Sequence, residues 1–329
     1  MKDILNQEEY SFLKSDKRFG DNMILLGIVG SNAYGTNHDD SDVDLMGCTL
    51  NSGEEILLGK DFESYRDENT DTIIYSVNNF IDKLTNCNPS MLELLGLRPE
   101  FYLIKTDIGD EILKNKEMFI SKRRVIGAFK GFANQQLNRL NNNISNFDDS
   151  KERENMLRSL ENVKSNIEKR WTGENITLNL YLEDDDIKIN MDMKGQSLME
   201  FDKSYKQLSD CMRSYRRNRK LSQKKDDKHL CKHMMNMIRS YMVCIDILKT
   251  GEIITYRENE HELLMDLLNG EYLDSANREV DNEFWKILDE YKDKLREAEK
   301  ETKIPLEPDW KKIDKLRIKV NKLAVERMK

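Results

Sequence analysis

Hydrophobic and polar positions follow two different patterns along the chain, and the pattern changes near residue 115. Before that point, short apolar runs rich in Ile, Leu and Val lie between glycine or polar turns, which is typical of buried strands. The clearest run, 23–29, ends at a glycine, and further strands are expected at 62–65 and 71–77. After residue 115 the apolar spacing is mostly helical. The pattern therefore predicts an α+β protein with an N-terminal sheet and a mostly helical remainder.

Apolar residues at helical spacing also mark individual segments. Helices are expected at 1–22, 77–85, 89–95 after the Asn88-Pro89 break, 116–145, 152–170, from 198 onward, at 228–249 and twice within 273–329. Residues 175–193 interrupt this series, because apolar and polar residues alternate on both sides of an acidic turn, which predicts a β-hairpin. We therefore expect three regions: a first domain at 1–115, a helical domain with the hairpin at 116–272, and a C-terminal helical extension at 273–329.

Composition narrows the class of protein. The chain has 329 residues, 38% hydrophobic and 35% charged, with only four prolines, which indicates a helix-rich globular protein. No apolar run approaches the roughly 20 residues of a membrane span, and the N-terminus lacks a secretory signal, so we expect a cytoplasmic protein without a membrane partner. Five scattered cysteines without a C-x-x-C pair argue against a disulfide framework and a zinc site. The sequence indicates no particular oligomeric state.

The candidate chemistry lies between Gly27 and Gly47. A Gly30-Ser31 turn follows the first strand and offers backbone N–H groups and a hydroxyl to an anion. Asp42 and Asp44 come 11 and 13 residues after Ser31, and the period-two geometry of a strand turns both carboxylates to one side. Neighbouring carboxylates repel each other unless a cation lies between them, and such oxygen ligands suit Mg²⁺. A phosphate site beside a Mg²⁺ site is what a nucleoside triphosphate (NTP) requires.

Other interpretations of the acidic pair fit less well. An EF-hand loop beginning at Asp40 would need glycine and a bidentate glutamate where Leu45 and Asn51 stand. No G-x-x-x-x-G-K-[ST] sequence is present, so a P-loop is excluded. A solvated acidic turn without function is the remaining alternative. We prefer the functional interpretation because the spaced pair follows a strand and a Gly-Ser turn.

These residues resemble a known family. Gly30-Ser31 followed by Ser41-Asp42-Val43-Asp44 resembles the signature of the DNA polymerase β-like nucleotidyltransferase superfamily. The longer string 30–47 is similar to bacterial and phage predicted nucleotidyltransferases related to RNA-repair-associated polymerase β-like proteins. Further similar segments lie at 71–77, 88–95, 247–252 and 304–309. The resemblance is weakest across residues 145 to 222.

The resemblance implies a mixed sheet with flanking helices and a two-metal nucleotidyl transfer. Asp42 and Asp44 would bridge two Mg²⁺ ions, or Mn²⁺ in their place. The residues assigned to nucleotide binding in this first domain are Gly30, Ser31, Asn32 and Tyr34. The substrate implied is an NTP such as ATP, and pyrophosphate would be released.

A third carboxylate is expected to join the acidic pair, and two residues are candidates. Asp71 is favoured as a metal ligand and catalytic residue, because it lies on a predicted strand that can pair beside Asp42 and Asp44. Glu93 lies in an apolar helix, where a buried or capping carboxylate is the alternative interpretation.

In the helical domain, Lys232, Asn236 and Arg239 are spaced to share one helix face, and we assign them to nucleotide binding. The matching family stretch reads Lys-His-x-x-His-x-x-Arg, so Asn236 departs from it, which puts an acid or base role there in doubt. The alternative is a solvated basic stripe.

A separate basic run spans residues 213 to 228, with eight Lys or Arg side chains against two Asp, in a chain of net charge −8. Its candidate acceptor-binding residues are Arg213, Arg216, Arg217, Arg219 and Lys220. Such a run can hold an RNA backbone, or it can be a loop that closes over the triphosphate.

The sequence thus supports three hypotheses. The first is a metal-dependent transfer of a nucleoside monophosphate to RNA, with a tRNA-like 3′ end as the leading acceptor. The second keeps the chemistry but places the nucleotide on a protein or a small molecule. The third is a non-catalytic nucleotide-binding component of a repair or defence system, against which the intact Asp42, Asp44 and Asp71 argue.

Overall fold

The computed structural model describes most of the chain. The described ranges are 2–38, 41–60, 62–145, 149–168, 177–183, 186–192, 195, 197–221, 227–275 and 279–328. The chain folds into two compact units. Unit 1 contains Met1–Asn134, Met235–Leu267 and Asn282–Lys329, and unit 2 contains Gln135–Met234 and Leu268–Asp281. Both units take segments from more than one of the three expected regions, and the boundaries at 115 and 272 stay a prediction.

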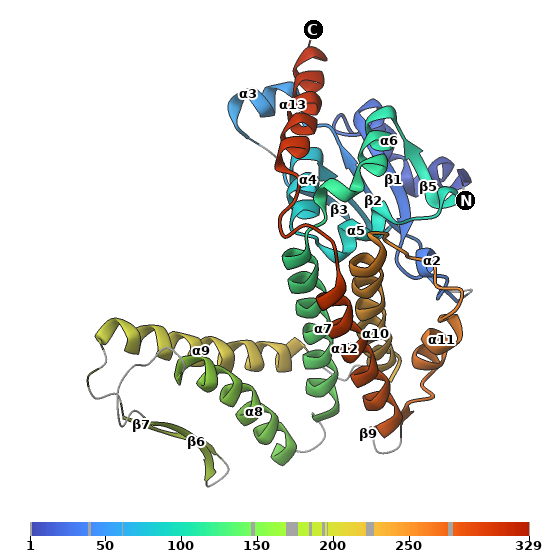
Figure 1. Ribbon diagram of the computed structural model, residues 1–329. Helices are drawn as coiled ribbons and strands as arrows, with labels where there is room; N and C mark the ends of the chain where they lie inside the picture. Colours follow the sequence, from blue (N-terminus) through green and yellow to red (C-terminus); the bar gives the residue numbers. More distant parts are fainter. Residues whose placement is uncertain are drawn as a thin grey trace. The chain divides into compact units, whose positions relative to one another are not determined.

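Unit 1 contains a five-stranded sheet in the order β3-β4-β2-β1-β5 (Figure 1). The strands are β1 (Met23–Val29), β2 (Asp44–Thr49), β3 (Ser64–Asp67), β4 (Thr72–Ser76) and β5 (Tyr102–Lys105). Strand β2 pairs in parallel with β4, whereas the other neighbours are antiparallel. The sheet is therefore mixed, as expected. All seven residues of β1 are buried, which explains why its sequence is continuously apolar.

Unit 1 also contains helices. They are α1 (Phe12–Ser15), α2 (Ser31–Tyr34), α3 (Gly53–Leu58), α4 (Val77–Thr85), α5 (Pro89–Leu95), α6 (Asp107–Lys114), α12 (Asn282–Glu301), α13 (Trp310–Glu326) and most of α11 (His261–Asn269). Of these, α2, α4, α5 and α6 contact the sheet. Two long helices, α7 (Lys122–Ser145) and α10 (Asp227–Thr250), contribute residues to both units. The α+β prediction is confirmed. None of the helices within the described ranges combines the length and apolar character that a membrane span needs.

The single helix expected at 1–22 is wrong. The segment forms α1 and three short 3-10 turns, η1 (Lys2–Asn6), η2 (Glu8–Tyr10) and η3 (Gly20–Asn22). Asp16 leaves the helical conformation, and its carboxylate accepts a hydrogen bond from the backbone N–H of Arg18 at 2.9 Å. Such local bonds compete with helix hydrogen bonds. Gly20, with φ of 56°, prevents a continuous helix farther along.

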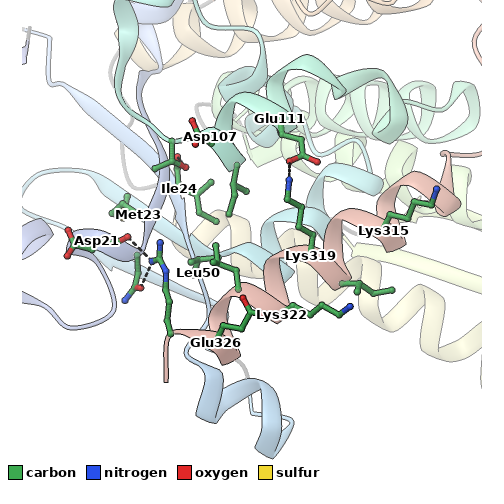
Figure 2. Close-up of a pocket in the computed structure, with 16 residues that line it drawn as sticks. Asp21, Met23, Ile24, Leu50, Asp107, Glu111, Lys315, Lys319, Lys322 and Glu326 are labelled. Atoms are coloured by element: carbon green, nitrogen blue, oxygen red, sulfur yellow. Dashed lines mark hydrogen bonds and ion pairs between the residues drawn. The ribbon is translucent and has the colours of Figure 1, made fainter. Parts of the chain in front are cut away.

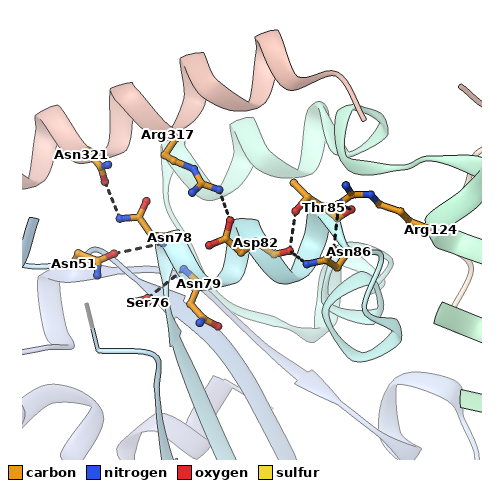
Figure 3. Close-up of polar contacts among 10 residues, drawn as sticks. All are labelled: Asn51, Ser76, Asn78, Asn79, Asp82, Thr85, Asn86, Arg124, Arg317 and Asn321. Carbon is orange, nitrogen blue, oxygen red and sulfur yellow. Dashed lines mark hydrogen bonds and ion pairs between the residues drawn. The ribbon is translucent and has the colours of Figure 1, made fainter. Parts of the chain in front are cut away.

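The C-terminal helix α13 is part of unit 1 rather than an appendage. It packs against α3 and α4 (Figure 1). The Asn78 side chain donates to Asn321 Oδ1 at 3.1 Å, and Arg317 forms an ion pair with Asp82 at 2.6 Å (Figure 3). Ile313, Leu316 and Val320 supply the buried face of the helix. The last helix thus helps to cover the N-terminal sheet domain.

Helix α5 is fixed closely against β1. Asn88 caps its first turn by accepting hydrogen bonds from two backbone N–H groups, and Pro89 occupies the first helical position. A Cβ on Gly27 of β1 would lie 2.5 Å from a Leu97 side-chain carbon and 3.0 Å from one of Leu94. Glycine at this position therefore allows the helix to approach the strand, and α5 brings Glu93 to the end of β1.

Unit 2 contains the expected hairpin, formed by β6 (Thr177–Glu183) and β7 (Asp186–Asp192) in antiparallel pairing. Helices α8 (Asp149–Glu168) and α9 (Leu198–Leu221) contact each other, and α8 also packs on the hairpin. Their common core contains Leu160, Ile167, Leu178 and Leu208. Strands β8 (Leu273–Asp274) and β9 (Glu279–Val280) form a second small ladder. The hairpin is confirmed, although its expected tip, 184–185, lies outside the described residues.

Candidate functional site

The turn after β1 requires glycine for two reasons. Gly30 has φ of 72° and ψ of −146°, a backbone conformation that residues with a side chain rarely adopt. In addition, a Cβ at this position would lie 2.1 Å from Asp44 Oδ2. The short helix α2 then begins at Ser31. The Gly30-Ser31 turn therefore lies directly against Asp44, the first residue of β2.

The register of the sheet brings the two motifs together. Asp44, the first residue of β2, pairs with Val29, the last residue of β1. Asp42 does not lie on the strand where it was expected, because β2 begins at Asp44. The Asn32 side-chain amide donates to the backbone carbonyl of Asp42 at 3.2 Å and so connects α2 to the segment before β2. Asp42 is exposed, and Ser31 and Asp44 are half-buried. The turn and the acidic pair thus share one accessible edge of the sheet.

Asp71 lies at the same edge but outside the strand where it was expected. Strand β4 begins at Thr72, which pairs with Leu45. Asp71 is exposed, its backbone carbonyl accepts the Leu45 N–H at 3.3 Å, and its φ is 42°. The register places Asp71 beside Asp44, although its left-handed backbone breaks the strand geometry. Its role as third carboxylate stays a prediction.

Glu93 is buried and contacts the turn directly. Its Oε1 accepts the backbone N–H of Gly30 at 2.6 Å. Burial raises the pKa of Glu93, while the positive charge of Arg239 and the Gly30 hydrogen bond lower it, and the nearby Asp44 carboxylate raises it further. The Tyr34 hydroxyl beside it also lowers the pKa of Glu93. These contacts fit the alternative interpretation of Glu93 as a buried carboxylate.

Residues of α10 reach the same cluster. The Arg239 guanidinium stacks over the Tyr34 ring at 3.6 Å, and its Nη2 donates to Asn236 Oδ1 at 3.1 Å. Tyr34 is buried, and desolvation raises the pKa of its hydroxyl. A cavity of about 30 Å³ lies among Tyr34, Glu93, Asn236 and Arg239. This volume suffices for one water molecule, not for a nucleotide.

The remaining expected binding residues belong to unit 2. Lys232 is exposed on α10, one turn before Asn236. Arg213 is exposed on α9. The other acceptor-binding candidates lie farther along α9, with side chains outside the described part of the chain: Arg216, Arg217, Arg219 and Lys220. The nucleotide and acceptor roles of these residues stay predictions.

Asp42, Asp44 and Asp71 are the candidate ligands of a metal ion at this site. The carboxylates of Asp42 and Asp44 have the oxygen chemistry that Mg²⁺ prefers, and they lie at the accessible edge beside the turn. Within the described ranges, however, no group of three or more His, Cys, Asp or Glu side chains is close enough to hold a metal ion. The pair thus fits a metal by its chemistry, and the part of Asp71 in the metal site stays a prediction.

A much larger cavity lies at the opposite ends of the same strands (Figure 2). It has a volume of about 740 Å³ and is lined by Met23 and Ile24 at the start of β1, Leu50 after β2, and several residues of α13. Lys319 on α13 forms an ion pair with Glu111 on α6. Since Val29 and Asp44 stand at the other ends of these strands, the candidate site does not coincide with this cavity.

Sequence reasoning missed the bond between Glu93 and Gly30 and the stacking of Arg239 on Tyr34. The available signal for the first was a lone carboxylate within the apolar helix sequence Met91-Leu92-Glu93-Leu94-Leu95. A charged residue that is fully buried normally has a specific partner. The second contact joins residues about 200 positions apart, and neither segment signals it locally.

Comparison with known proteins gives one family match, which covers the sheet of unit 1. Residues 4–164 match the model of the family described as RNA repair pathway DNA polymerase beta family (RlaP). This range contains all five strands of the sheet, the Gly30 turn and the carboxylates at 42, 44, 71 and 93. Searches among curated proteins and among solved structures found no match. The match over residues 4–164 therefore supports a polymerase β-like nucleotidyltransferase family for this part of the chain.

Proposed function

We propose that this protein transfers a nucleoside monophosphate from an NTP to an acceptor hydroxyl. The observation that carries the proposal is the contact between the Gly30-Ser31 turn and the Asp44 carboxylate at one edge of the sheet. In the reaction, the acceptor oxygen forms a bond to the α-phosphorus. The bond from that phosphorus to the bridging oxygen breaks, and pyrophosphate leaves with its electron pair.

Each residue of the site has a proposed task. Ser31 and Asn32 bind the phosphates from the α2 side of the turn. Asp42 and Asp44 hold Mg²⁺, or Mn²⁺ in its place, and Asp71 is the proposed third carboxylate. The metal supplies charge neutralisation for the phosphates. Lys232 and Asn236 are proposed to contact the nucleotide, whereas the buried Tyr34 ring and the Arg239 guanidinium stacked on it lie behind the turn.

RNA is the proposed acceptor, with a tRNA-like 3′ end as the first candidate. Two observations support it: the family match, whose description names an RNA repair pathway, and the basic run between residues 213 and 228. Clustered Lys and Arg side chains bind a nucleic-acid backbone by neutralising its phosphates. A protein or small-molecule acceptor would need the same catalytic residues, so the acceptor must be identified by experiment.

The test uses the purified chain with each of the four α-³²P-labelled NTPs, Mg²⁺ or Mn²⁺, and either tRNA or total RNA. We expect label in RNA that has a free 3′ hydroxyl and none in RNA whose 3′ end has been oxidised with periodate. The D42N/D44N variant should give no labelled RNA. Label in a protein or a small molecule would replace the acceptor, and absence of transfer from every NTP would contradict the proposed enzyme activity.

A further inference from the structure

The backbone N–H of Gly30 already has an acceptor inside the protein. Glu93 Oε1 accepts it at 2.6 Å, across 63 positions of the sequence. At 2.6 Å this bond is shorter than most N–H···O hydrogen bonds in proteins. The sequence alone had assigned this N–H to a phosphate. With Glu93 in place, the groups left to receive a phosphate begin at Ser31.

Helix α5 holds the Glu93 carboxylate in position. Leu92 and Leu94, its neighbours in sequence, are fully buried, and Asn88 caps the start of the helix. Leu94 packs at the place where Gly27 lacks a side chain. Because the helix is anchored on both sides of residue 93, Glu93 cannot swing out to solvent without disturbing the packing on β1.

Two further residues complete the surroundings of Glu93. Tyr34, the last residue of α2, lies beside its carboxylate with its hydroxyl, which lowers the pKa of Glu93. Arg239 covers the Tyr34 ring at 3.6 Å, and its positive charge favours the ionised form of Glu93. The neighbouring cavity holds no more than a water molecule. Glu93, with Tyr34 and Arg239 beside it, therefore acts on the Gly30-Ser31 turn from inside the protein, away from the exposed Asp42.

We propose that Glu93 is a positioning residue, which holds the Gly30-Ser31 turn in the conformation that receives the triphosphate. This inference rests on the proposed function. Glu93 fixes Gly30 from the side of α5, while the Asp44 carboxylate borders Gly30 from the side of β2. The phosphate contacts then belong to Ser31 and Asn32. Tyr34 and Arg239 support the carboxylate and do not contact the nucleotide.

The Gly30 amide can be observed directly. Val29-Gly30 is the only Val-Gly pair in the sequence, so ¹³C-carbonyl valine combined with ¹⁵N-glycine labels a single amide. We compare the wild type with E93Q, which keeps the side-chain volume, and with E93A. The Gly30 proton should move upfield in both variants, and its exchange with solvent should become at least about tenfold faster in E93A.

The matched control is L95V, which removes one buried methylene from the same helix and leaves Glu93 intact. It should leave the Gly30 signal in place. If E93A does not fold, E93Q decides the question alone. A Gly30 signal and exchange rate that are the same in E93Q as in the wild type would overturn the positioning role. So would a wild-type signal that shifts to the E93Q position when NTP is added, because phosphate would then replace Glu93.

The nucleotide affinity of the same samples gives a second readout. We expect the dissociation constant for a fluorescent NTP to rise about tenfold in E93Q and to stay unchanged in L95V. Equal affinities of E93Q and the wild type would contradict the inference even if transfer is confirmed. If the wild type transfers no nucleotide, the proposed function fails, while the Gly30 signal still decides whether Glu93 fixes the turn.

Discussion

The two ends of the β1–β2 pair differ in size and in chemistry. At one end, the Gly30 turn, Asp44 and Glu93 lie within contact of one another, and the adjoining cavity measures about 30 Å³. At the other end, a cavity of about 740 Å³ lies under α13 (Figure 2). Among the described residues of the larger cavity the ion pair is the exposed one of Lys319 and Glu111, whereas the small end carries a glycine with positive φ and a buried carboxylate. Converging polar groups, rather than volume, therefore identify the candidate site.

The largest expected effect is on the rate of nucleotide transfer. It should appear when one negative charge is removed at each end of the strands and the two variants are compared. D44N should reduce nucleotide transfer at least about 1,000-fold, which corresponds to roughly 4 kcal/mol of transition-state stabilisation. Its melting temperature should stay the same or rise, because the substitution removes the repulsion between Asp44 and Glu93. D107N, in the lining of the large cavity, should retain full transfer. Normal turnover by D44N would remove Asp44 from the metal site.

The next largest effect is expected on the free energy of unfolding, when a side chain is added to Gly30. G30A should lower the free energy of unfolding by about 2–4 kcal/mol, because the backbone conformation and the overlap with Asp44 both oppose a side chain. Gly59 is the matched control, since its φ is 63° and a Cβ there would meet nothing within 4 Å. G59A should lower the free energy by only about 1 kcal/mol. Equal urea midpoints for the two variants would show that Asp44 does not constrain Gly30.

Asp71 can be tested without disturbing its backbone. Asparagine tolerates the left-handed conformation that Asp71 adopts, so D71N removes the charge and leaves the turn intact. If Asp71 is the third carboxylate, transfer should fall about 100-fold with the unfolding midpoint unchanged, in line with a loss of about 2.7 kcal/mol. Unaltered kinetics would exclude Asp71 from the catalytic group and leave the pair of Asp42 and Asp44.

The sequence predicted those parts of the fold that depend on local patterns. The apolar run of β1, the alternation in the unit 2 hairpin and the Asn88-Pro89 start of α5 each signal their structure within a few residues. The expected helix at 1–22 failed where a local signal, the Asp16 turn, competed with apolar periodicity. The position of α13 against α4 depends on contacts such as Asn78 to Asn321, which no local pattern encodes.

In the candidate site, too, features that depend on local sequence were predictable, whereas contacts between distant segments were not. The turn and the position of Asp44 on the next strand were predictable because they lie within 15 residues of sequence, whereas Asp42, which was expected on the same strand, precedes β2. The partner of Gly30 was not, since Glu93 reaches it only through the packing of α5 on β1. Asp71 was placed at the correct edge, but its left-handed backbone could not be read from a sequence that resembles the start of a strand.

The smallest effect is expected at the large cavity. Lys319 and Glu111 form an ion pair there, with side chains 58% and 37% exposed, so solvent screens most of their attraction. K319A should change the free energy of unfolding by less than about 0.5 kcal/mol and leave both the KM for NTP and the transfer rate unchanged. The measurements are a urea titration and the labelled-NTP assay with RNA. A K319A variant of normal stability that transfers nucleotide to RNA more slowly would show that the lysines of α13 take part in acceptor binding, and the two ends of the strands would then belong to one functional surface.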